Sequence, residues 1–142
     1  TLSDSVCSIC SSSSTDYGKT YHTECHEVWY YDYNNRIQKL KRLESLCIVC
    51  HNIKHTNQHK KDEEYFKLLL QVYAGLNGIE LEQAYKEYED AIRIRYSRKD
   101  IKYKLDLTYL KNYDENIEIF DCHSEEFNKF LERWNKEDDK KD

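Results

Sequence analysis

The stretch Leu46-Cys-Ile-Val-Cys-His-Asn-Ile-Lys-His55 (LCIVCHNIKH) decides the fold of this chain. Cys47 and Cys50 form a Cys-x-x-Cys pair, which places two thiolates about one tight turn apart, as metal knuckles do. His51 and His55 follow directly, four residues from each other, so their rings share one face if a helix begins here. The stretch therefore predicts a metal-binding turn that opens a short helix.

A second Cys-x-x-Cys pair, Cys7 and Cys10, lies upstream and is separated from the first by 36 residues. Two such pairs supply four thiolates, the number that completes a tetrahedral zinc site. The N-terminal third is small and polar, so it buries too little apolar surface to fold without metal. We predict one structural Zn²⁺ held by Cys7, Cys10, Cys47 and Cys50, and inert buried thiols at Cys25 and Cys122.

The composition favours a metal site over disulfides. Residues 1–20 contain neither a basic flank nor an apolar stretch, so no secretory signal is visible. No run of about 18 apolar residues occurs, which excludes a conventional transmembrane helix. Six Cys residues in such a chain indicate zinc in a reducing, intracellular (cytoplasmic) compartment.

The N-terminal part reads as strands followed by a helix. Residues 19–33 are rich in Tyr, Thr, Val and Trp, which favours a strand, and Asn34-Asn35 predicts a turn. Periodicity leaves 36–46 open between a strand and a helical turn. The aromatic residues Trp29, Tyr30, Tyr31 and Tyr33 could stack on bases, but aromatic residues of a strand more often lie in the core, which we expect here.

The chain beyond residue 56 reads as mainly helical. The first apolar stripe is Tyr65, Leu68, Leu69, Val72 and Leu76, which ends at Asn77-Gly78. The second is Leu81, Ala84, Tyr85, Tyr88, Ala91 and Ile92. Residues 101–110 predict an extended segment before a helical turn. A last helix is expected after an N-cap at Ser124, with the stripe Phe127, Phe130, Leu131 and Trp134.

The motifs together resemble the zinc-bearing HNH endonucleases, also called the His-Me finger family. The resemblance covers residues 7–55 and rests on both Cys pairs, on Glu24-Cys-His-Glu-Val-Trp29, and on the stretch 46–55. It implies an α+β fold: a zinc-stapled ββα-metal module over 1–56, followed by a helical extension over 57–142 that packs on it, with a frayed charged tail over 135–142. The segment 97–110 also looks like the C-terminal part of some HNH proteins.

The resemblance further implies hydrolysis of phosphodiester bonds in DNA. In that family a strand histidine acts as general base, and a divalent metal, usually Mg²⁺ or Mn²⁺, stabilises charge on the phosphate. Carried over by position, His51 and His55 match the helix that holds this metal, and His26 and Glu27 match the catalytic strand pair. Imidazole suits this work because it titrates near neutral pH.

This chain differs from the family pattern at two positions. The strand pair is His26-Glu27 instead of Asp-His or His-His, so either His26 is the base, or His26 binds the metal and Glu27 takes the base's place. On a strand, Glu24 shares a face with His26, which makes it the acid nearest in orientation. The family's middle Asn is replaced, with Arg42 at the closest position.

The charge distribution indicates a nucleic-acid partner, although the net charge is −5. Residues 36–61 contain seven Lys/Arg and a single acid, Glu44. A basic segment of this kind favours contact with phosphates, and we expect DNA as the partner. Two alternatives stay open: an inactive zinc module that binds nucleic acid, and a regulatory protein-interaction module built on the HNH scaffold.

Overall fold

The computed structural model describes residues 6–13 and 23–117, together with residues 125, 128, 129 and 132. The described elements follow the order β1 (Glu24–Asp32), β2 (Ile37–Leu46), α1 (Ile48–Lys54), η1 (Thr56–His59), α2 (Glu63–Asn77), α3 (Leu81–Arg98), β3 (Lys104–Asp106) and η2 (Thr108–Asn112). A β-hairpin followed by helices confirms the predicted α+β class.

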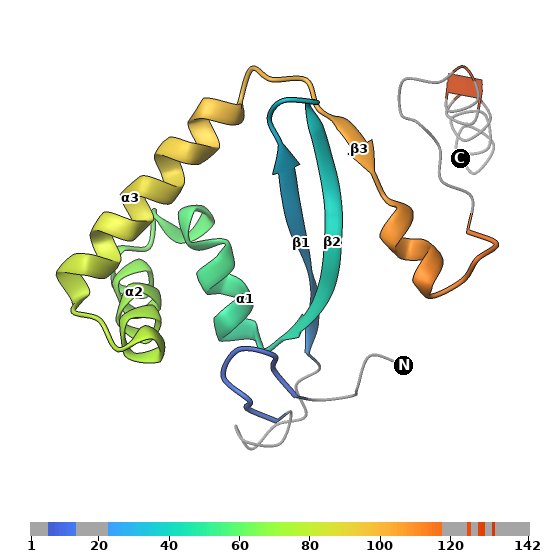
Figure 1. Cartoon of the computed structure of the whole chain (residues 1–142). Helices are drawn as coiled ribbons and strands as arrows, with labels where there is room; N and C mark the ends of the chain where they lie inside the picture. Colours follow the sequence, from blue (N-terminus) through green and yellow to red (C-terminus); the bar gives the residue numbers. More distant parts are fainter. Residues whose placement is uncertain (1–5, 14–22, 118–124, 126–127, 130–131, 133–142) are drawn as a thin grey trace, which may run out of the picture. The chain divides into compact units, whose positions relative to one another are not determined.

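The two long strands form an antiparallel hairpin, to which a short third strand is added (Figure 1). The residues 36–46 that periodicity left open are therefore mostly strand. In the turn, the Asp32 carboxylate accepts hydrogen bonds from the backbone N–H and the side-chain amide of Asn35. The turn at Asn34-Asn35 is confirmed, but Arg36, with φ 52°, takes the left-handed conformation.

β3 pairs with β2 in parallel, with Ile37 opposite Lys104 and Lys39 opposite Asp106. η2 follows directly after β3. The prediction of an extended segment and then a helical turn over 101–110 is therefore confirmed. The predicted last helix is a different case, because Ser124 and the apolar stripe assigned to it lie outside the described residues.

The chain divides into two compact units. Unit 1 comprises residues 1–26 and 43–100, and unit 2 comprises residues 27–42 and 101–142. Both strands of the hairpin therefore contribute residues to each unit. Both Cys-x-x-Cys pairs and the whole stretch 46–55, with His51 and His55, belong to unit 1.

Three helices and one 3₁₀ turn build the core of unit 1, with α2 packed against α1, η1 and α3 (Figure 1). Asp62 caps the start of α2 by accepting a hydrogen bond from the backbone N–H of Tyr65. Gly78 ends the helix with φ 63°, a conformation that a residue with a Cβ rarely adopts.

The buried face of α2 differs from the predicted stripe. Leu69, Leu70 and Ala74 are buried, whereas Leu68 is 49% exposed and Leu76 is 44% exposed. The predicted stripe was correct for Leu69, and Tyr65 and Val72 are half-buried, but it was wrong for Leu68 and Leu76. Apolar residues extend over a wide arc of the helix, so periodicity alone could not select the side that packs. No helix in the described part of the chain combines the length and apolar character that crossing a bilayer requires.

Candidate metal centres

Four cysteines from three parts of unit 1 converge on one point, and we call Cys7, Cys10, Cys47 and Cys50 the four-Cys cluster. Cys7 and Cys10 come from the N-terminal loop, Cys47 follows the end of β2, and Cys50 lies in α1. Their sulfur atoms all lie within 4.8 Å of one another. Cys7 and Cys50 are almost fully buried, together with Leu46, and these residues form a small core around the cluster.

Backbone hydrogen bonds shape the N-terminal loop around its two thiols. The N–H of Cys7 donates to the carbonyl of Ser12, and the N–H of Ser11 donates back to the carbonyl of Cys7. Ser11 closes this turn with φ 60°. Both the N–H and the hydroxyl of Ser8 donate to the carbonyl of Ser45, which ties the loop to the end of β2. The loop therefore presents its Cys pair to the second pair without any apolar core of its own.

The spacing of the thiols suits a zinc ion rather than a disulfide. The sulfurs of Cys10 and Cys47 are 3.7 Å apart. A disulfide would need about 2.05 Å, whereas four sulfurs about 2.3 Å from a tetrahedral zinc ion lie about 3.8 Å from one another. The hydroxyl of Ser12 also lies 3.0 Å from the sulfur of Cys10, as an outer-shell partner would. The donor set and its spacing therefore fit a structural Zn²⁺.

The thiols differ in acidity when no cation is present. Burial disfavours the charge of Cys7, but backbone N–H groups that point at its sulfur lower the pKa to about 7. Burial, and then the neighbouring thiols, raise the pKa of Cys50 far above its ordinary value, and burial raises the pKa of Cys47. Four thiolates cannot share this space without a compensating positive charge. A divalent cation supplies that charge, and its binding releases protons.

Cys47 connects the four-Cys cluster to the helix that follows it. It is the N-cap of α1, and its sulfur accepts a hydrogen bond from the backbone N–H of Cys50. The N–H of His51 donates to the carbonyl of Cys47 in the same turn. α1 therefore begins at Ile48, three residues before the expected start at His51, because the knuckle itself forms the first turn of the helix.

Three imidazoles form a second group of potential ligands, and we call His26, His51 and His55 the three-His cluster. His26 comes from β1, His51 from α1, and His55 from the C-cap of α1. One ring nitrogen from each lies within 4.8 Å of the others, and the ring centroids are 4.8 to 5.3 Å apart. All three residues are half-buried, as are Cys10 and Cys47, whereas Cys7 and Cys50 are almost fully buried.

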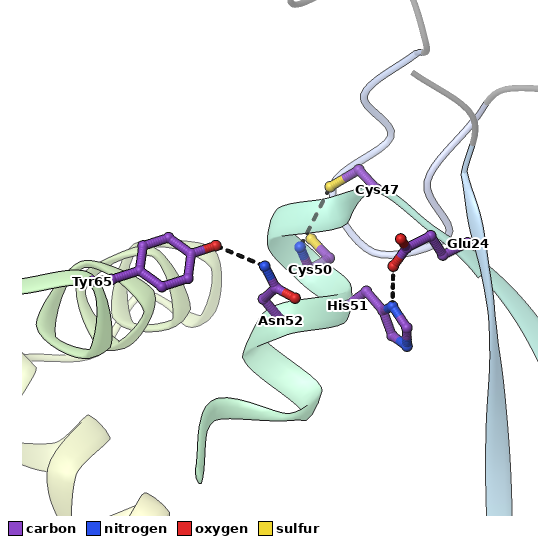
Figure 2. A network of polar contacts seen from close by, with 6 residues as sticks. All are labelled: Glu24, Cys47, Cys50, His51, Asn52 and Tyr65. Carbon is purple, nitrogen blue, oxygen red and sulfur yellow. Dashed lines mark hydrogen bonds and ion pairs between the residues drawn. The ribbon is translucent and has the colours of Figure 1, made fainter. Parts of the chain in front are cut away.

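Two polar contacts hold α1 from opposite directions, as Figure 2 shows. Nδ1 of His51 donates to the carboxylate of Glu24, and Nδ2 of Asn52 donates to the hydroxyl of Tyr65 at 2.7 Å. The first contact joins α1 to β1, and the second joins α1 to α2. With Nδ1 of His51 engaged, its Nε2 is the nitrogen that remains for a metal.

The sequence identified most of these residues but not all of their contacts. Glu24 had been placed on the same strand face as His26, yet its contact with His51 could not be read from strand periodicity. Glu27 is exposed and lies outside the three-His cluster, and strand alternation directs its side chain away from that of His26. Tyr65 had appeared only as a member of an apolar stripe.

Two expectations about burial were wrong. Cys25 is exposed rather than buried, and Glu24 and Glu27 beside it on β1 are exposed as well. Tyr30 and Tyr33 are 57% and 55% exposed, whereas Trp29 and Tyr31 are half-buried. Of the other residues considered, Cys122 lies outside the described part of the chain.

Comparisons of the chain with protein-family models, with curated proteins and with solved structures found no significant match.

Proposed function

We propose that this chain is a metal-dependent endonuclease of the HNH type that hydrolyses phosphodiester bonds of DNA. The observation that supports this most is the position of the three-His cluster, directly beyond the first turn of a helix that begins at a four-thiolate site. A hairpin, a helix, a closed thiolate site and an adjacent open imidazole site together match what the family resemblance implies.

In this proposal the three-His cluster holds the catalytic cation. When bound there, a divalent cation would stabilise negative charge on the phosphate and on the leaving oxygen. The four-Cys cluster cannot do this, because four thiolates fill a tetrahedral shell and leave no open position. Three imidazole nitrogens suit later first-row ions better than Mg²⁺, which prefers oxygen ligands. The tests below therefore include Co²⁺ and Ni²⁺ beside Mg²⁺ and Mn²⁺.

The residues around the cluster divide the remaining tasks. Glu24 fixes the tautomer and orientation of His51 through Nδ1. If His26, His51 and His55 all bind the cation, Glu27 is left to accept the proton of the attacking water. If Glu24 replaces His26 as a ligand, His26 accepts that proton itself. The convergence of the three rings favours the first assignment, and the orientation of Glu27 on the strand favours the second.

Exposed cations provide the contact with the DNA backbone. All seven Lys/Arg of residues 36–61 are exposed, four of them in unit 2 and three in unit 1. Each phosphate that they neutralise releases counterions, so binding should weaken as salt is added. We also propose that the zinc-bearing module spans residues 1–56, and that the free thiols of the four-Cys cluster reflect a reducing, intracellular compartment.

Nicking of supercoiled plasmid by the zinc-loaded protein tests the proposal. We expect nicked circles only when Mg²⁺, Mn²⁺, Co²⁺ or Ni²⁺ is added, and none with His51→Ala. Absence of cleavage in every metal would contradict the enzyme. Salt-sensitive binding without cleavage would then identify an inactive nucleic-acid-binding module, and absence of both would identify a protein-interaction module.

A further inference from the structure

A groove of about 520 Å³ lies within unit 2, and no residue of the two clusters is among its lining residues. Tyr30, Lys39 and Lys41 of the hairpin line it, together with Tyr109 and Asn112 of η2. We call it the hairpin groove. It is open and shallow, and it combines aromatic rings, Lys side chains and an amide.

The aromatic residues of the hairpin groove are not accounted for by the core. Tyr30 is 57% exposed although it lies in the middle of a strand. The ring of Tyr109 packs edge-to-face on Tyr113 with centroids 5.8 Å apart, and Tyr113 is itself 56% exposed. Tyr31, in contrast, packs against Tyr103 with centroids 5.3 Å apart. The next tyrosine along β1 is therefore used in packing, while Tyr30 keeps its ring available to a ligand.

The charge of the hairpin groove suits an anion. Its described lining contains two Lys residues and no carboxylate. The described residues of unit 2 carry eight Lys/Arg and seven Asp/Glu, although the whole chain has a net charge of −5. Asp106 accepts hydrogen bonds from the hydroxyl and the backbone N–H of Thr108, which lower its pKa, and Lys39 and Lys104 lower that pKa further.

We propose that the hairpin groove binds an unpaired nucleic-acid strand, with bases stacked on Tyr30 and Tyr109 and phosphates held by Lys39 and Lys41. Exposed aromatic rings beside cations are the means by which proteins bind single strands. A duplex keeps its base faces stacked inside the helix and offers only phosphates, so it cannot cover these rings. The inference rests on the proposed function in taking nucleic acid as the ligand, but it needs no catalysis.

Fluorescence anisotropy with a labelled oligo(dT) strand of about twelve nucleotides tests the inference, using zinc-loaded protein without other added metal. We expect tighter binding to this strand than to an oligo(dA)·oligo(dT) duplex of equal length. Tyr30→Leu should weaken strand binding about tenfold through the loss of one stacked base, while Tyr30→Trp should retain it. Tyr33→Leu is the matched control, because Tyr33 is equally exposed but does not line the groove.

The Lys contacts have a separate readout. Lys39→Gln with Lys41→Gln should reduce the slope of log K against log salt by about 1.4, since each phosphate contact with a single strand contributes about 0.7. Lys102→Gln with Lys111→Gln is the control, because both residues are exposed in unit 2 and lie outside the lining. An oligo(U) strand of the same length shows whether RNA is accepted as well as DNA, and either result is compatible with the stacking geometry.

Three results would overturn the inference: duplex bound at least as tightly as the strand, equal losses for Tyr30→Leu and Tyr33→Leu, or equal changes in slope for the two Lys pairs. Preferential binding of an oligo-glutamate peptide would overturn it in favour of a protein partner. Strand binding that depends on Tyr30, without plasmid nicking, would support this inference and contradict the proposed nuclease activity. Plasmid nicking, with strand binding that Tyr30→Leu does not change, would support the nuclease activity and contradict this inference.

Discussion

The four-Cys and three-His clusters share one short helix, in which Cys50 and His51 are consecutive, yet they differ in donor type and in burial. Of the four cysteines, Cys7 and Cys50 are almost completely buried, and Cys10 and Cys47 are half-buried. The three imidazoles are all half-buried, come from a strand and a helix, and number one ligand fewer than a tetrahedral site needs. A closed shell of thiolates holds a fold together, whereas an open shell of imidazoles can admit water and phosphate.

The four-Cys cluster also determines the position of the three-His cluster. Because Cys47 is both a thiolate of the closed site and the N-cap of α1, the zinc site sets where the helix begins. The start of α1 in turn sets the positions of His51 and His55. The two clusters should therefore respond to mutation unequally: damage to the four-Cys cluster should abolish both sites, and damage to the three-His cluster should leave the fold unchanged.

The largest expected effect follows from removing the zinc. Structural zinc contributes about 10–16 kcal/mol in small domains, which exceeds the roughly 5–15 kcal/mol net stability of a typical domain. Cys47→Ser or a strong chelator should therefore abolish the folding of unit 1, as measured by circular dichroism and elemental analysis. Cys25→Ser is the control, because this exposed thiol lies outside the cluster. An unchanged melting temperature in chelator would contradict a structural zinc in the four-Cys cluster.

The next largest effect concerns the packing of α2, which contacts α1. Leu69 is fully buried in α2, so Leu69→Asp places an unpaired charge in the core and should cost several kcal/mol. Leu68→Asp, one residue earlier and 49% exposed, should change the free energy of unfolding by well under about 1 kcal/mol. Urea denaturation of both variants measures the contrast. Equal stabilities would mean that α2 does not pack as described.

Mutation of the three-His cluster should affect activity and not stability. His26→Ala should lower the nicking rate about 100-fold or more if His26 is the base, since a positioned catalytic proton transfer contributes about 10²–10⁴. His51→Ala should abolish nicking at low metal concentration, because it removes a ligand of the cation. Partial recovery of His51→Ala at high Mn²⁺ would indicate a lost ligand. Zinc content and melting temperature should stay at the parent values. His59→Ala is the control, because His59 packs on Tyr65 outside the cluster. A variant that loses zinc along with activity would contradict the independence of the open site.

The smallest effect separates the two carboxylates of β1. Glu24→Gln should weaken binding of the catalytic metal about tenfold, because outer-shell partners of ligating His residues contribute about 10–100-fold. Glu27→Gln should leave metal affinity unchanged and lower the rate if Glu27 is the base. Isothermal titration together with the metal dependence of nicking distinguishes these outcomes. Full activity of Glu27→Gln would assign the base to His26.

The predictability of the two clusters from sequence also differed, for a physical reason. Ligand spacing within a Cys-x-x-Cys pair is local, so Cys7, Cys10, Cys47 and Cys50 could be grouped by their positions alone. The same holds for His51 and His55, which are one helical turn apart. The contact of Glu24 with His51 depends on how β1 approaches α1, and no local pattern records it. The predicted burial of Tyr30 and Leu68 was wrong for the same reason, because their exposure depends on which neighbours cover each face of the strand or helix.

Addition of Co²⁺ to the zinc-loaded protein tests the central distinction most directly, with native mass spectrometry for stoichiometry and visible absorption for the ligands. We predict that one further metal ion binds, that its spectrum lacks thiolate-to-cobalt charge transfer, and that His51→Ala with His55→Ala abolishes it while the zinc remains. Failure to bind a second ion, or a second ion with thiolate ligands, would contradict an open imidazole site beside a closed thiolate one.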